Sequence, residues 1–130
     1  MKRQIPKEKG EEAEKFIAKI FRAHKSSNEA YDLVNKTSLI EVKSCEALHP
    51  DKRECFSFHL GRFTLITENH RELLREAHDK KKKPVYVFVL RVDKYKLFKK
   101  YPAQLLKVPS DRKHFHVSWG KIFYEDLDGN

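Results

Sequence analysis

The strongest constraint on this chain is the run Val85-Tyr86-Val87-Phe88-Val89-Leu90, in which every side chain is apolar or aromatic. Such a run is typical of a β-strand that is buried on both faces. A strand of this kind needs cover on both sides, which a chain of 130 residues supplies by packing helices onto one central sheet. The run therefore predicts one α/β domain over residues 1–130.

The pattern around this strand predicts its partners. Apolar residues recur every three or four positions over 10–24 and from 67 to about 82, so both segments are expected to be helices, the second ended by Pro84. Alternating or β-branched segments predict further strands at 30–35, 38–44, 56–60 and 114–124. The expected architecture is a mixed central sheet with helices packed on it.

The charge of the chain predicts a polyanionic partner. Lys and Arg number 28 against 19 Asp and Glu, for a net charge of +9, and nucleic acid is the commonest partner of so basic a domain. No apolar run approaches the roughly 20 residues of a membrane span, and the first six residues lack the apolar stretch that is typical of a signal peptide. We therefore expect a cytoplasmic protein with no membrane partner, in which Cys45 and Cys55 are free thiols.

The segment between the first two predicted strands places two carboxylates together. If Lys36-Thr37 is the two-residue loop of a hairpin, Asp32 lies opposite Glu41 on the same face of the sheet. Opposed side chains have Cβ atoms about 5 Å apart, so the two charges repel unless something compensates them. Hard oxygen ligands at this spacing suit Mg²⁺ or Mn²⁺, and Lys43 lies one pleat away. Glu14 falls on the apolar side of the first helix, where it can reach this pair.

These residues resemble the PD-(D/E)XK nuclease superfamily, whose core is a helix, three strands, a helix and a strand. The resemblance is closest to the archaeal-type Holliday-junction resolvases and covers residues 9–92, with 93–130 as a C-terminal extension. It rests on Lys9-Gly10-Glu11-Glu12-Ala13-Glu14-Lys15, Tyr31-Asp32-Leu33-Val34 and Ile40-Glu41-Val42-Lys43-Ser44. Tyr31 stands where the superfamily usually has proline, and the loop before Asp32 lacks the glycines common in the resolvases.

The resemblance implies a restriction-endonuclease-like fold and Mg²⁺-dependent hydrolysis of DNA phosphodiester bonds, with Mn²⁺ able to substitute and no small-molecule cofactor. It implies Holliday or branched junctions as the substrate. For so small an enzyme we expect a homodimer, because cutting two strands symmetrically calls for two sites related by a twofold axis. Asp32, Glu41 and the backbone carbonyl of Val42 would hold the metal. Glu14 would hold a second metal or a metal-bound water, and Lys43 would orient the water or stabilise charge on the phosphate.

Six further residues are predicted to contact nucleic acid. Ser26 or Ser27 sits where the resolvases carry a loop serine near the scissile phosphate, and the loop after Lys43 is expected near the active edge. The complete predicted set is Lys9, Ser26, Ser27, Lys52, Arg53 and Arg62.

Other functions remain open at this point. They are a repair, restriction or phage-type nuclease on duplex or flap DNA, a non-catalytic nucleic-acid-binding module, and a metal-independent RNA-cleaving enzyme.

Overall fold

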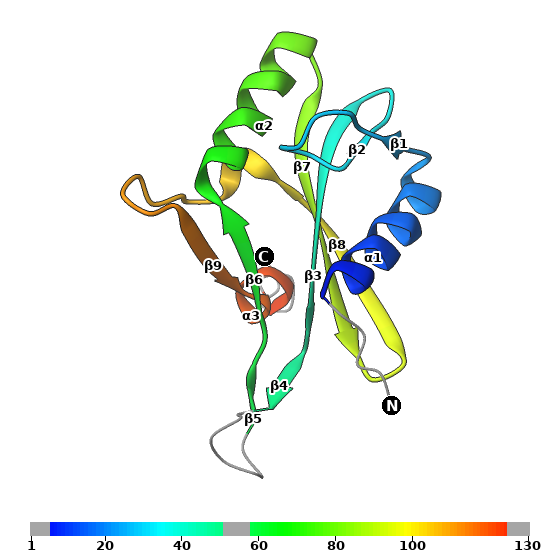
Figure 1. Cartoon of the computed structure of the whole chain (residues 1–130), viewed down its shortest axis with the longest axis vertical. Helices are drawn as coiled ribbons and strands as arrows, with labels where there is room; N and C mark the ends of the chain where they lie inside the picture. The colour runs from blue at the N-terminus through cyan, green and yellow to red at the C-terminus, as the bar shows by residue number, and fades with distance from the viewer. Residues whose placement is uncertain (1–5, 51–57, 125–130) are drawn as a thin grey trace.

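The computed structural model describes residues 6–50 and 58–124, with side chains over 10–48 and 61–124. Its central sheet has the strand order β1-β2-β3-β7-β8, in which β3 and β7 are parallel and the other neighbours antiparallel (Figure 1). The elements are α1 (Pro6–Phe21), β1 (His24–Lys25), β2 (Leu33–Val34), β3 (Ser38–Glu46), β4 (Leu48–Pro50), β5 (Phe58–Leu60), β6 (Arg62–Ile66), α2 (Thr67–Lys80), β7 (Lys83–Val92), β8 (Tyr95–Pro102), the 3₁₀ turn η1 (Ala103–Leu105), β9 (His114–Ser118) and α3 (Trp119–Phe123).

The predicted doubly buried strand is confirmed as the centre of β7, where Val85–Leu90 are all buried. Its valines form one core with Ala13 and Ile17 of α1. Its aromatic residues face the other way and join a larger core with Phe63 of β6 and Leu73 of α2. Figure 1 shows the same division, with α1 on one side of β3 and α2, β6 and β9 on the other. The predicted mixed sheet with helices packed on it is therefore confirmed.

The first helix ends three residues earlier than the predicted 10–24. Arg22 has a positive φ of 51°, which turns the chain out of the helix. The N–H of Ala23 then donates to the carbonyl of Ala18 at 2.9 Å, the bond that closes a Schellman-type helix end. Because the helix stops here, His24–Lys25 is free to form β1 along the edge of β2, a strand the sequence pattern did not predict.

The predicted hairpin register is confirmed, since Leu33 pairs with Ile40 and Val34 with Leu39. The turn is closed by Asn35, whose side-chain oxygen accepts hydrogen bonds from the backbone N–H groups of Thr37 and Ser38. However, β2 is two residues long rather than spanning 30–35. The preceding residues instead form a side-chain-stabilised turn, in which Asn28 Oδ1 accepts from the Ala30 N–H at 2.7 Å.

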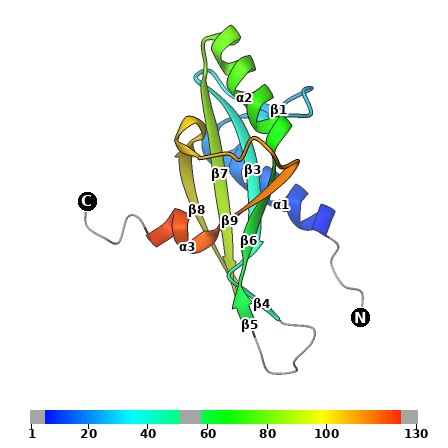
Figure 2. The ribbon, with the colours of Figure 1, turned by 90° about the vertical axis from the view of Figure 1, so that its left-hand side faces the viewer.

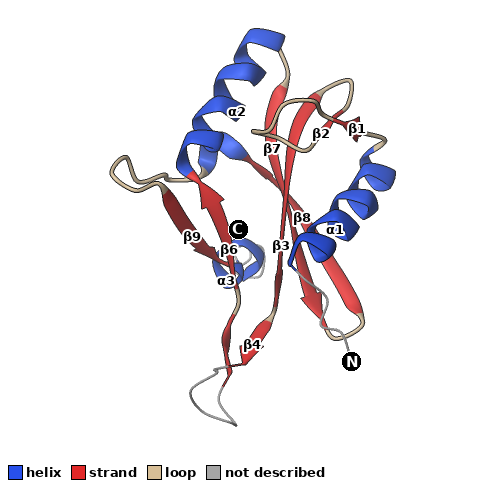
Figure 3. Cartoon of the chain, viewed as in Figure 1, coloured by secondary structure: helices blue, strands red, loops and turns tan. Residues whose placement is uncertain are grey.

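The segment after β3 differs from the prediction. β3 continues to Glu46, and β4 pairs with β5 in a separate ribbon at the lower end of the molecule (Figure 3). The predicted strand 56–60 is therefore present as Phe58–Leu60 but lies outside the central sheet, while 56–57 fall outside the described residues. β6 was not predicted, and it leads directly into α2 (Figure 2).

The C-terminal segment adds β8, which pairs with β7 as the fifth strand of the central sheet. The predicted strand 114–124 ends at Ser118, because the Ser118 hydroxyl accepts from the Gly120 N–H and begins α3. Trp119 is consequently helical, and its indole N–H donates to the Ala47 carbonyl at 2.8 Å. None of the helices in the described parts of the chain is long and apolar enough to cross a membrane.

Candidate active site

Asp32 and Val42 define the open edge of the central sheet. β2 begins at Leu33, and among the described residues no other strand pairs with this edge of β3 beyond it. The Asp32 carboxylate occupies this position and accepts a hydrogen bond from the Val42 backbone N–H at 2.8 Å. In a strand the N–H and C=O of one residue point to the same side, so the Val42 carbonyl is on the Asp32 side of β3.

Glu41 is buried next to Asp32, with only 6% of its surface exposed. Burial, a hydrogen bond with Asp32 and the Asp32 charge raise the pKa of Glu41 to about 10, although the nearby Lys43 opposes the shift. The Lys43 ammonium lies 3.8 Å from Glu41 Oε2. The alternation along β3 thus places Glu41 and Lys43 on one face, as the sequence predicts.

Glu14 joins the same cluster from α1. Its pKa is raised to about 7 by partial burial, by the charge of Asp32 and by a hydrogen bond with Asp32, while Lys25 of β1 pulls it down. α1 packs on the face of β3 opposite to Glu41. Glu14 nevertheless reaches Asp32, which lies just before β2 begins at Leu33. Asp32 is therefore the middle member of three converging carboxylates.

The three carboxylates offer donors that fit a divalent cation. They are oxygen ligands, and they gather beside Val42. Burial first, and then the charge of Asp32 and a hydrogen bond with it, raise the pKa values of Glu14 and Glu41. Within the described residues no group of three acidic, histidine or cysteine side chains already has the arrangement of a formed metal site. The carboxylates instead hydrogen bond in pairs through Asp32.

An open hollow of about 430 Å³ lies in front of this cluster. Glu14 and Asp32 form part of its wall, and the loop that carries Ser26 and Ser27 forms another part, together with Lys25. The two predicted serines are thus brought to the carboxylates, together with Lys25, a basic group that no sequence motif indicated.

The remaining predicted nucleic-acid contacts are not gathered here. Arg62 is exposed at the start of β6 and does not line the hollow. Lys9 belongs to α1, but its side chain is outside the described set. Lys52, Arg53 and Cys55 lie outside the described residues, whereas Cys45 is a free thiol whose pKa burial raises to about 12.

His70 and Tyr86 form a buried pair on the Glu41 side of the sheet. Tyr86 is next to Glu41 in the β3–β7 register, and its hydroxyl lies 2.8 Å from His70 Nδ1. From the sequence alone, His70 is expected to be a surface or lightly buried histidine, but only 3% of it is exposed. Its spacing from Leu73 and Ala77 on the buried stripe of α2 was the signal that places it inside.

Comparison with solved structures shows a match to Hjc, a Holliday junction resolvase from the archaeal hyperthermophile Archaeoglobus fulgidus. The TM-score is 0.56 at 18% sequence identity, and the match covers 85% of this chain and 84% of that one. This share exceeds what residues 1–92 alone can supply, so the likeness extends into the C-terminal segment. No protein-family model matches the sequence, and no significant match to a curated protein was found. The chain therefore has the restriction-endonuclease-like fold in the form seen in this archaeal resolvase.

Proposed function

We propose that this protein is a divalent-metal-dependent endonuclease that hydrolyses DNA phosphodiester bonds, with branched junctions as its first candidate substrate. The observation that carries the proposal is the meeting of Glu14, Asp32 and Glu41 at one open sheet edge, with Lys43 beside them. The resolvase fold and the net charge of +9 support DNA as the partner.

Asp32, Glu41 and the Val42 carbonyl are the proposed ligands of Mg²⁺ or Mn²⁺. The bound cation supplies Lewis acidity and lowers the pKa of bound water. Glu14 borders the hollow, and a pKa of about 7 suits a carboxylate that orients water or accepts its proton, or that holds a second metal. Lys43 supplies a fixed positive charge for the phosphate oxygens in the transition state. Hydrolysis then joins the water oxygen to phosphorus, breaks one P–O bond and passes a proton to the leaving oxygen.

The scissile strand is proposed to lie in the hollow, against Lys25, Ser26 and Ser27. Lysine and serine side chains at such a position bind phosphate oxygens and fix the position of the strand without reading its sequence. Lys9, Lys52, Arg53 and Arg62 remain proposed contacts to more distant phosphates. We also propose a homodimer, because two sites related by a twofold axis suit paired cuts across a junction.

The test is cleavage of end-labelled DNA by wild type and Lys43→Ala. The substrates are a four-way junction, a flap, a plain duplex and a single strand, each with MgCl₂, MnCl₂ or EDTA. We expect metal-dependent cutting by wild type, fastest on the junction, and its loss in the variant. Lys100→Ala, which removes an exposed lysine of β8, is the matched control. DNA binding without cutting by wild type would instead favour the non-catalytic binding module.

A further inference from the structure

The loop of residues 26–32 carries Asp32 but has little β-ladder to hold it, since β2 contains two residues. Its backbone is tied at its two ends. Ser26 N–H donates to the Asp32 carbonyl, and Asp32 N–H donates to the Ile40 carbonyl, both at 2.9 Å. Within the loop, Ser26 Oγ accepts from the Asn28 N–H at 2.9 Å. These local bonds give the loop its shape but do not attach its outer part to the rest of the molecule.

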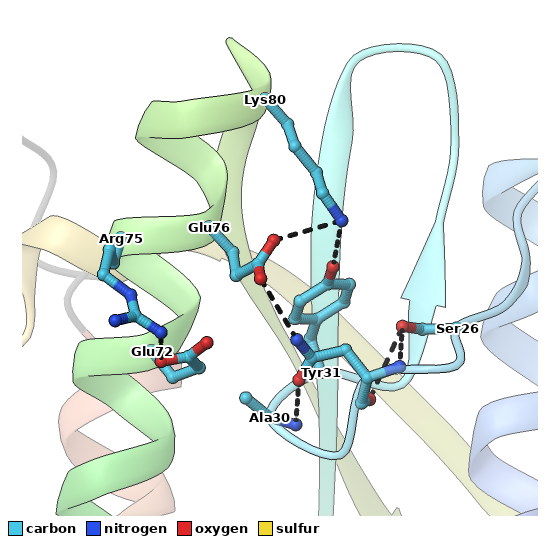
Figure 4. A network of polar contacts seen from close by, with 8 residues as sticks. Ser26, Ala30, Tyr31, Glu72, Arg75, Glu76 and Lys80 are labelled. Carbon is cyan, nitrogen blue, oxygen red and sulfur yellow. Dashed lines mark hydrogen bonds and ion pairs between the residues drawn. The ribbon is translucent and has the colours of Figure 1, made fainter.

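Two side chains of α2 make polar contacts with the loop, as Figure 4 shows, in addition to the packing of Ala30 and Tyr31 in the core. Glu76 Oε1 accepts from Asn28 Nδ2 at 3.4 Å. The Lys80 ammonium lies 3.1 Å from Glu76 Oε2 and donates to the Tyr31 hydroxyl at 3.0 Å. We call Glu76 and Lys80 the α2 clamp. It holds the loop at two points, Asn28 and Tyr31, from one helical turn.

The clamp is linked to the carboxylate cluster through the adjacent residues Tyr31 and Asp32. Tyr31 is 2% exposed and belongs to the core that contains Leu73 and Ala77 of α2. Asp32 reaches Val42 on the β3 edge instead. Consecutive Cα atoms are about 3.8 Å apart and joined by a planar peptide, so a displacement of Tyr31 moves Asp32 with it.

We propose that Glu76 and Lys80 are positioning residues that hold the 26–32 loop where Asp32 meets Glu14 and Glu41, and where Ser26 faces the hollow. This inference rests on the proposed function, because it assigns the clamp a role in metal binding and cleavage at that same site. Neither clamp residue touches substrate in this account. Both act through the loop.

The test compares Glu76→Ala with Glu72→Ala. Glu72 lies one turn earlier on α2 and pairs with Arg75 of the same helix rather than with the loop (Figure 4). In Glu76→Ala we expect the Mg²⁺ concentration for half-maximal cleavage to rise, or kcat to fall, by about tenfold, the range typical of residues that orient metal ligands. KM for DNA should change little, and Glu72→Ala should stay within about twofold of wild type on every measure.

Two milder variants separate positioning from general destabilisation. Glu76→Gln keeps an oxygen acceptor for Asn28 but loses the charge that pairs with Lys80, so it should restore part of the activity. Tyr31→Phe removes only the hydroxyl that accepts from Lys80, and should raise the Mg²⁺ requirement while leaving the fold intact. A lower melting temperature in Glu76→Ala with unchanged Mg²⁺ requirement and kcat would overturn the proposal.

Mn²⁺ affinity, measured by titration of the same variants, separates the failure of this proposal from the failure of the proposed function. If wild type binds Mn²⁺ but cleaves no DNA, the proposed nuclease function is wrong. The positioning role of the α2 clamp is then tested by the Mn²⁺ affinities of the variants alone. Equal affinities in Glu76→Ala and Glu72→Ala then reject the clamp. If wild type neither binds Mn²⁺ nor cleaves, both proposals are rejected.

Discussion

The Asp32 carboxylate accepts a hydrogen bond from the Val42 backbone N–H across 2.8 Å. This bond takes the place of a backbone hydrogen bond that a longer β2 would make with β3. The Val42 N–H on the strand edge is therefore hydrogen bonded to a side chain rather than to the backbone. One carboxylate thereby contacts two others, Glu14 from α1 and Glu41 from β3. The candidate site thus lies where β2 ends and the edge of β3 is left to the Asp32 side chain.

Asp32→Asn is expected to reduce cleavage by at least about 100-fold, the scale seen when one preorganised charged or dipolar group is lost from a catalytic site. The amide retains an oxygen that can accept from Val42, so the loop should keep its place while the metal ligand is weakened. Gel-shift measurements in EDTA should show DNA affinity no weaker than that of wild type, since the change removes negative charge. Affinity falling in parallel with cleavage would point to a disrupted fold instead.

Stability without metal should depend on pH through Glu14 and Glu41. Both have pKa values raised in the folded protein, to about 7 and about 10, so between the ordinary value of 4.5 and these values the folded state binds more protons than the unfolded state. The free energy of unfolding therefore falls as pH rises through this window. Melting temperatures in EDTA should decrease from pH 5 to pH 8 more steeply in wild type than in Glu41→Gln. Parallel curves would show that Glu41 does not contribute to the fall in the free energy of unfolding with pH.

Glu41→Gln should also be more stable than wild type in EDTA at pH 8, while losing cleavage. A pKa of about 10 keeps Glu41 protonated in the folded protein at pH 8, so folding must supply the free energy of taking up that proton. The neutral amide needs no proton and can still hydrogen bond with Asp32. Adding MgCl₂ should then raise the melting temperature of wild type and leave that of the variant unchanged, because only wild type has the complete set of proposed ligands. Equal Mg²⁺ effects on the two proteins would place the cation elsewhere.

The core beneath the site should be sensitive to truncation at Phe88. This side chain is fully buried, with its ring centroid 4.6 Å from that of Phe63. Phe88→Ala is expected to lower the free energy of unfolding by about 3–5 kcal/mol, as for other buried aromatic truncations. Phe98→Ala on the edge strand β8, where 40% of the residue is exposed, should cost clearly less. Urea denaturation of both variants measures the difference, and equal losses would contradict the assignment of Phe88 to the core.

The features that sequence predicted best are those set by short-range periodicity. The alternation of β3 and the two-residue loop place Asp32, Glu41 and Lys43 together, and the apolar run fixes the centre of β7. The positions where helices end were harder to predict, because Arg22 adopts the left-handed conformation that glycine usually supplies. The sequence pattern similarly predicts Trp119 as part of a strand. In the structure Ser118 caps α3, and Trp119 is the first residue of that helix.

Long-range contacts between polar side chains were not accessible from sequence. In the sequence, the run Lys80 to Lys83 is equally typical of a solvated helix end and of a phosphate-binding patch. In the structure Lys80 binds Tyr31 and Lys82 donates to the Asn35 carbonyl at 2.7 Å. Both contacts join segments almost fifty residues apart, so no local pattern indicates them.

The most direct test of the central claim is titration of MnCl₂ into wild type and Asp32→Asn, with free Mn²⁺ followed by electron paramagnetic resonance. The claim is that Glu14, Asp32 and Glu41 gather to bind a divalent cation. We expect saturable binding by wild type that is lost or strongly weakened in the variant, and that is competed by Mg²⁺. Equal binding by the two proteins, or none by wild type, would contradict it.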